Sequence, residues 1–117
     1  MAENHEDFWD PTRLEEMVGG DEEFILELLQ LFLDSTGADV QALSDAAKTK
    51  EYGQVVHRSH TIKGASGNIG ADKLMAVAGQ LEQYAKTELD SALDTMIAEV
   101  VDVYRHTVTA IRVRIQR

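Results

Sequence analysis

Three residues within about one helical turn carry the most specific chemical signal in the sequence: His60, Lys63 and Gly64. On a helix surface, residues three and four positions apart are neighbours, so the lysine and the glycine would flank the imidazole. A histidine side chain can act as a covalent nucleophile, and a nearby ammonium can supply positive charge to phosphoryl oxygens. This combination indicates a histidine that carries a phosphoryl group.

The segment around His60 predicts a helix that turns this residue outward. Apolar and small residues recur at steps of four and three and mark one inward face, made of Val55, Ser59, Ile62, Ser66 and Ile69. At about 100° per residue, His60 lies roughly 200° from Ile62, away from that face. The exposed side holds Gly64 and Gly67, although glycine in a helix interior costs about 1 kcal/mol relative to alanine. Bare backbone there would let a partner approach the imidazole.

Helical periodicity extends over most of the chain, and no segment shows the alternation typical of a strand. Asp10 and Pro11 favour the start of a short first helix, which Gly19 would end. The longer helices are expected at 21–47, with a bend at Gly37, at 51–68, at 71–86, and after a capping box at 87–90. The inner face expected for the fourth helix is Leu74, Ala78, Leu81 and Ala85, and that of the fifth is Leu93, Ile97, Val100, Tyr104, Val108, Ile111 and Ile115.

These elements predict an all-α protein, an antiparallel four-helix bundle with a short N-terminal helix that caps one end. Residues 1–9 are expected to form an acidic and flexible N-terminal segment, and residues 10–117 the bundle domain. The apolar spacing is near 3.5 residues, so a dimeric coiled coil is an alternative.

Composition narrows the function further. The chain has 117 residues, no cysteine and a formal net charge of -10. Thiolate zinc sites, disulfides and thiol nucleophiles are therefore excluded, and the acidic balance argues against a nucleic-acid partner. No apolar run is long enough for a membrane span, and the acidic start does not resemble a signal peptide, so a cytoplasmic protein is expected.

The sequence His60-Thr-Ile-Lys63-Gly64-Ala-Ser66-Gly-Asn-Ile-Gly70 resembles the signature of histidine-containing phosphotransfer (HPt) domains. It is most similar to the form found in the N-terminal domain of chemotaxis-type histidine kinases, and the resemblance covers nearly the whole chain. It implies that His60 is phosphorylated and that Lys63 neutralises the phosphoryl oxygens. It also implies that Gly64 leaves room for an incoming receiver domain.

In this family, a Gln or Glu about 22 residues after the histidine hydrogen-bonds the inner ring nitrogen. The resemblance places Glu82 in that role, with Gln83 as the alternative if the helix phase differs. A carboxylate there would hold the proton on Nδ1 and leave Nε2 as the nucleophile. One departure is Ser59, which occupies a position where alanine is common in the family.

Further residues around the motif are expected to contact the partner. These predicted docking residues are His57, Arg58, Thr61, Gly67 and Lys73. Arg58, Lys63 and Lys73 would form a positive strip facing the acidic active site of a receiver. His57 and His60 could form an i, i+3 pair for zinc or nickel, but a third ligand other than Glu82 is missing, so no metal site is expected.

The expected function is that of a monomeric phosphorelay intermediate. His60 would accept a phosphoryl group from a histidine kinase, a hybrid kinase or a receiver aspartate, and pass it to an aspartate of a response-regulator receiver domain. The sequence contains neither a Walker loop nor a kinase-type glycine-rich loop, so no ATP binding or kinase activity is expected. No cofactor of its own is expected, and Mg²⁺ would belong to the receiver.

Two alternatives remain at the level of the sequence. The first is the dimeric phosphoacceptor domain of a histidine kinase, which usually has an acid directly after the histidine and a proline soon after. Here Thr61 follows, and no proline does. The second is a non-catalytic helical adaptor in which His60 is incidental. Met1 and the acidic start favour a free-standing protein over a domain cut from a hybrid kinase.

Overall fold

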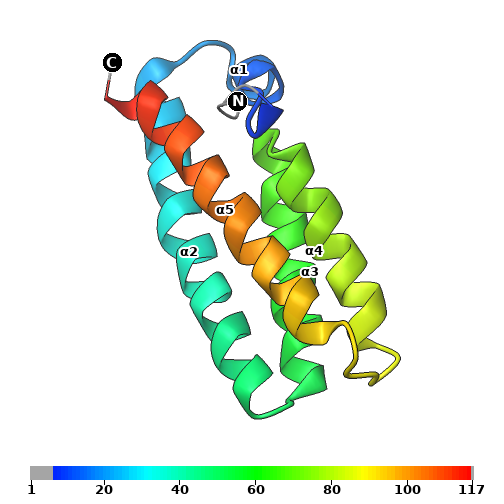
Figure 1. The fold of residues 1–117 in the computed structure, drawn as a ribbon. Coiled ribbons are helices and arrows are strands. Elements are labelled where there is room, and N and C mark those ends of the chain that lie inside the picture. Colours follow the sequence, from blue (N-terminus) through cyan, green and yellow to red (C-terminus); the bar gives the residue numbers. More distant parts are fainter. Residues whose placement is uncertain (1–6, 117) are drawn as a thin grey trace.

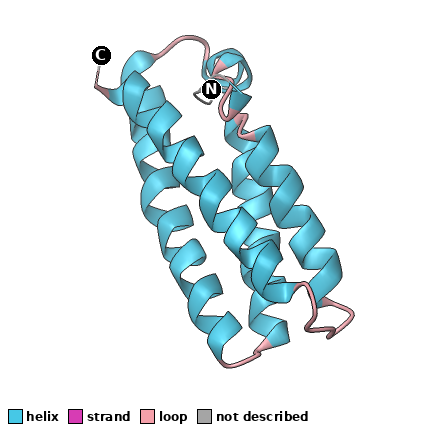
Figure 2. Ribbon diagram, in the orientation of Figure 1, coloured by secondary structure: helices cyan, strands magenta, loops and turns pink. Residues whose placement is uncertain are grey.

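The computed structural model describes residues 7–116, and these fold into five helices without a strand (Figures 1 and 2). The helices are α1 (Thr12–Val18), α2 (Glu22–Lys48), α3 (Tyr52–Ile69), α4 (Asp72–Ala85) and α5 (Leu93–Ile115). The four long helices run antiparallel to their neighbours in sequence, and α1 lies at the end of the bundle where α3 passes into α4. The predicted fold class is confirmed. A single chain covers its own apolar faces, which argues against the coiled-coil dimer.

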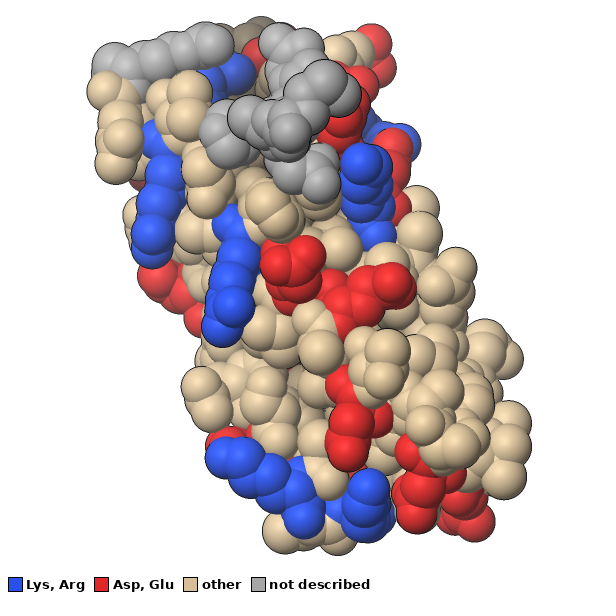
Figure 3. Space-filling view, viewed as in Figure 1, with Lys and Arg blue, Asp and Glu red and all other residues tan. Residues whose placement is uncertain are grey.

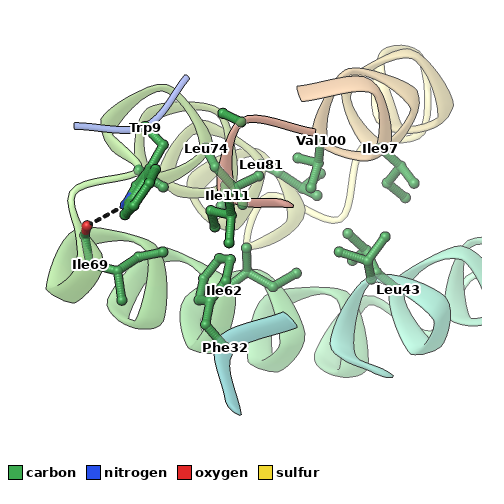
Figure 4. Close-up of a cluster of buried hydrophobic side chains, with 14 of the residues drawn as sticks. Trp9, Phe32, Leu43, Ile62, Ile69, Leu74, Leu81, Ile97, Val100 and Ile111 are labelled. Carbon is green, nitrogen blue, oxygen red and sulfur yellow. Dashed lines mark hydrogen bonds between the residues drawn. The ribbon is translucent and has the colours of Figure 1, made fainter. Parts of the chain in front are cut away.

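The core lies between the four long helices, and Figure 4 shows part of it. The inner faces predicted for α3 and α4 are confirmed, because every one of those residues is buried. On α5 the buried face differs in the second half, where Thr107 and Ala110 are buried and the predicted Tyr104, Val108 and Ile115 are only half-buried. The phenol of Tyr104 lies toward the edge, where its hydroxyl finds an acceptor in the carbonyl of Leu33 at 3.2 Å.

Gly37 serves the packing of α5 against α2. α2 continues through this residue as one helix. A Cβ atom at position 37 would lie only 2.9 Å from the Tyr104 hydroxyl oxygen. The glycine that the sequence assigned to a bend is therefore explained by the close approach of Tyr104.

Of three expected helix starts, the one at Asp21 is confirmed, the one at Asp10 is shifted by one residue so that Pro11 precedes α1, and the third is wrong. Asp21 caps α2 by accepting a hydrogen bond from the Phe24 amide at 3.1 Å, and Asp10 accepts one from the Thr12 amide at 2.9 Å. The capping box predicted at 87–90 does not open α5, which begins only at Leu93. Glu88 has a positive φ of 59°, so the chain turns there, and the Thr87 hydroxyl donates back to the carbonyl of Tyr84 at the end of α4.

The segment before α1 belongs to the fold from Phe8 onward, which corrects the expectation of a flexible stretch up to residue 9. Phe8 and Trp9 are buried. The Trp9 indole donates to the carbonyl of Ile69 at 2.8 Å (Figure 4), the Asp10 amide to that of Gly70 at 3.1 Å, and Arg13 to that of Gly67 at 2.6 Å. The last carbonyls of a helix lack partners within it, so this segment satisfies the end of α3 while it buries two aromatic rings. The remainder of the predicted segment, residues 1–6, lies outside the described residues.

Charged side chains of both signs share the surface formed by α2, α4 and α5. Figure 3 shows acidic and basic side chains interspersed on this face without a continuous basic area. At the end of the bundle, Arg114 pairs with Glu15 at 2.9 Å and with Glu22 at 2.8 Å, and so ties α5 to α1 and α2.

The junction between α3 and α4 generates the first prediction. Gly70 has a φ of +89°, and a Cβ atom there would lie 2.3 Å from the backbone oxygen of Asp10. Gly70→Ala should lower the free energy of unfolding by about 2 kcal/mol or more, since backbone strain and a steric clash act together. Urea denaturation followed by circular dichroism measures this loss.

Gly19→Ala is the matched control, because Gly19 shares the positive φ, at +68°, but has nothing within 4 Å of its Cβ position. Its loss should be the smaller of the two. Equal losses for both variants would mean that the contact with Asp10 contributes nothing.

Candidate functional site

His60 lies near the middle of α3 and faces away from the core. Its side chain is 65% exposed, whereas Ser59 and Ile62 are fully buried. The expectation that the helix turns this imidazole outward is confirmed.

Glu82 of α4 is brought against His60 by the antiparallel packing of α3 and α4. Its Oε2 lies 2.9 Å from the Nδ1 atom of His60. The carboxylate itself is almost entirely buried, with 6% of the side chain exposed. The expected contact is therefore present, and Gln83, the alternative, lies exposed one position further along α4.

Two lysines converge on the same carboxylate. Lys63 Nζ lies 2.9 Å from Glu82 Oε1 and forms an ion pair with it. Lys86 Nζ lies 3.6 Å from Oε2, the oxygen that faces His60. Sequence analysis did not single out Lys86, although its position four residues after Glu82 on one helix face was a usable signal.

The surroundings of Glu82 keep it ionised. Lys63 is the main cause that lowers the pKa of this carboxyl, with a further contribution from His60, and together they outweigh burial, which raises it. An ionised carboxylate can only accept a hydrogen bond, so the proton of a neutral imidazole resides on Nδ1. Nε2 then carries the lone pair, and it has no hydrogen-bond partner among residues 7–116.

The two glycines of the motif differ. Gly64 is exposed, and a Cβ atom there would meet nothing within 4 Å, so the backbone beside His60 is open to a partner. Gly67 was expected in the same exposed patch, but its Cβ position lies 2.8 Å from the Met75 sulfur. Because α4 packs closely against it, Gly67 permits helix packing and is only partly accessible.

The predicted positive strip is largely neutralised by local acids. Arg58 donates to Asp39 on α2 at 2.8 Å, and the Asp39 side chain is only 12% exposed. The Arg58 side chain is 36% exposed and its charge is paired with Asp39 between α2 and α3, so it adds less positive potential to the strip than the sequence suggested, and its contact with a partner stays a prediction. Lys73 is exposed and lies 4.5 Å from the centre of the Phe8 ring, a cation–π contact.

The remaining docking candidates lie on the surface. His57 and Thr61 are exposed on α3, and the Thr61 hydroxyl donates to the His57 carbonyl at 3.0 Å. Within the described part of the chain, no three His, Cys, Asp or Glu side chains converge as metal ligands would. None of the described helices is both long and apolar enough to cross a membrane.

Comparisons with known proteins match this arrangement. Residues 27–113 fit the family model described as Hpt domain. The chain is 35% identical over 74 residues to the phosphorelay intermediate protein rdeA of Dictyostelium discoideum, a match that covers 62% of this chain and 29% of that protein. It therefore spans less than a third of the length of this relative.

Among solved structures, the fold is similar to that of histidine-containing phosphotransfer protein B (HptB) from Pseudomonas aeruginosa PAO1. The TM-score is 0.87, and the alignment covers 94% of this chain and 96% of that one, at 21% sequence identity. At this level of identity the likeness establishes the shared fold.

The buried carboxylate generates the second prediction, which concerns pH. The pKa of Glu82 is lower in the folded chain than its ordinary value of 4.5. Its ion pairs therefore stabilise the fold above that value, and the contribution is lost as the pH falls through the folded pKa. Glu82→Gln should make the free energy of unfolding less dependent on pH between about pH 5 and 2.

Urea titrations at several pH values measure this slope. The matched control is Glu99→Gln, an exposed glutamate on α5, which should keep the slope of the parent chain. A Glu82→Gln variant that retains the parent slope would contradict the ion-pair account.

Proposed function

The chain belongs to the Hpt domain family, and from this premise we propose that it is a phosphotransfer intermediate of a two-component relay, with His60 as the residue that carries the phosphoryl group. The observation that supports this assignment most directly is the 2.9 Å contact between His60 Nδ1 and the buried carboxylate of Glu82. This contact leaves Nε2 as the nucleophilic atom of an exposed ring.

In the accepting step, the Nε2 lone pair attacks the phosphorus of an aspartyl phosphate. The N–P bond forms as the bond from phosphorus to the aspartate oxygen breaks, and the aspartate leaves as a carboxylate. The proton stays on Nδ1, so the ring gains a formal positive charge that the Glu82 carboxylate stabilises. Transfer to the next aspartate reverses these bond changes.

Glu82 does two things in this scheme. Before the attack it selects the tautomer whose Nε2 is unprotonated, and during the attack it stabilises the charge that develops on the ring. Both effects depend on its being ionised while buried, and Lys63 is the main cause of that ionisation.

Lys63 and Gly64 have roles at the moment of contact with a partner. In the resting chain the Lys63 ammonium lies on Glu82, so it reaches phosphoryl oxygens only by moving from one anion to another. Gly64 leaves open backbone next to the ring. A phosphoryl transfer with a loose transition state depends mainly on alignment and on positive charge, and two docked proteins can supply both.

The partners are a histidine kinase or hybrid kinase as donor and receiver domains of response regulators. His57, Thr61 and Lys73 remain the docking candidates with exposed side chains. The Mg²⁺ that the reaction uses would sit in the receiver, and ATP would bind only to the kinase. Since these partners act in the cytoplasm, we place the chain there, as a monomer.

Two other functions make different predictions. A dimeric phosphoacceptor domain would build its bundle from two chains, whereas here one chain covers its own core; light scattering that gives a dimer mass would favour it. A helical adaptor would carry no phosphate. Acid-labile, base-stable label on the chain after incubation with a phosphorylated receiver would exclude the adaptor.

The third prediction concerns His60 itself. His60→Gln should abolish phosphoryl acceptance and leave the fold intact, because the imidazole is mostly exposed. Transfer of radiolabel from a phosphorylated receiver gives the acceptance, and thermal denaturation gives the stability. His57→Gln, one turn earlier on the same helix, should still be labelled, because it leaves His60 in place. Labelling of the His60 variant would refute the assignment.

The fourth prediction concerns the open space beside His60 that Gly64 leaves for a partner. Gly64→Gln should keep or raise the melting temperature, since a side chain there meets open space and glycine is a poor helix former. It should slow transfer by obstructing the partner. Gly53→Gln is the matched control, because Gly53 is also exposed on α3 with nothing within 4 Å. Transfer at the parent rate by the Gly64 variant would remove the clearance argument.

A further inference from the structure

Gly79 of α4 lies directly beneath the side chain of Lys63. A Cβ atom at position 79 would lie 3.2 Å from Lys63 Cδ and 3.9 Å from Cγ. The aliphatic stem of the lysine thus crosses α4 at the one place where this helix has no side chain. Its ammonium then reaches Glu82, one turn further along α4.

The backbone gives no separate reason for a glycine at this position. Gly79 lies in the interior of α4, and it is not among the glycines with positive φ. A glycine there costs about 1 kcal/mol of helix stability relative to alanine. The space that this glycine leaves for the Lys63 side chain gives a reason for keeping it despite the lower helix stability.

The Lys63 contact determines how the Glu82 carboxylate is shared. Lys63 occupies Oε1 at 2.9 Å, so Oε2 remains for His60 Nδ1. Without Lys63, both oxygens of the buried carboxylate would be available to His60 and to Lys86, which lies 3.6 Å from Oε2. The carboxylate would then no longer be fixed in one orientation toward Nδ1.

A ring that is held less firmly at Nδ1 carries a proton on Nε2 more of the time. The titratable and charged groups around it are Lys63 and His57 on its own helix, and Glu82 and Lys86 on α4. Loss of the Lys63 contact removes the positive charge closest to Glu82, which also favours the doubly protonated ring. A protonated Nε2 has no lone pair with which to attack phosphorus.

We propose that Gly79 is a positioning residue of the phosphotransfer site: its bare backbone lets Lys63 reach Glu82, and Glu82 thereby holds the His60 proton on Nδ1. This inference rests on the proposed function of His60. Gly79 acts through Lys63 and Glu82 and touches no phosphoryl group itself.

The test is a graded series at position 79. Gly79→Ala adds one carbon against the Lys63 stem, and Gly79→Leu fills its path. We expect acceptance of a phosphoryl group to slow slightly in the first variant and about tenfold in the second, as for loss of one charged contact. Both variants should remain folded at the assay temperature, because the gain in helix propensity over glycine offsets part of the stability lost with the Lys63–Glu82 ion pair. Gly53→Leu, the matched control, should transfer at the parent rate.

A double-mutant cycle with Lys63 separates positioning from general disturbance. In a Lys63→Met background, Gly79→Leu should cause no further loss of rate, because the contact it displaces is already absent. The proposal would be overturned if the rate losses of the two substitutions multiplied in the double variant. It would also be overturned if the position-79 variants transferred at the parent rate, or if their slower transfer were explained by unfolding.

The ¹⁵N shifts of the His60 ring give a readout that needs no phosphate. At pH 7, a larger fraction of Nε2 should be protonated in Gly79→Leu than in the parent chain or in Gly53→Leu. Unchanged shifts would overturn the role of Gly79 even if His60 is phosphorylated. A parent chain that accepts no phosphate would refute the proposed function, and the ring shifts would still test the path of Lys63.

Discussion

A single buried carboxylate organises the functional surface of this bundle. Glu82 is almost entirely buried, yet it stays ionised because Lys63 and His60 pair with it, and Lys86 lies 3.6 Å from its Oε2 atom. A buried charge is tolerated only when it is paired, so the positions of all three partners are constrained together. The orientation of an exposed imidazole therefore depends on a group that no partner protein can reach directly.

Much of this was accessible from the sequence. The apolar step pattern of each helix correctly assigned the buried faces of α3 and α4, since hydrophobic periodicity in a long helix is a strong signal. The outward direction of His60 followed from the same phase. The family resemblance then pointed to Glu82, because local periodicity alone says nothing about which residue of another helix lies opposite.

The remainder depended on contacts between segments that are distant in the chain. Asp39 and Arg58 each looked like surface charges, and only the packing of α2 against α3 brings them together as an ion pair in which Asp39 is buried and Arg58 is partly exposed. Phe8 and Trp9 adjoin an acidic stretch, so composition favoured a flexible segment, whereas in the fold both rings are buried and the Trp9 indole donates to the Ile69 carbonyl at the end of α3. The role of Gly79 was likewise invisible, because a glycine has no side chain to suggest what crosses it.

The docking of Trp9 has a practical consequence for spectroscopy. It is the only tryptophan in the chain, and its indole is hydrogen-bonded to the last turn of the helix that bears His60. Its emission thus comes from one defined place, the junction of α3 and α4, and needs no attached dye. Release of this junction would expose the indole to water and shift its fluorescence to longer wavelength, so local opening there can be followed apart from the helicity of the whole bundle.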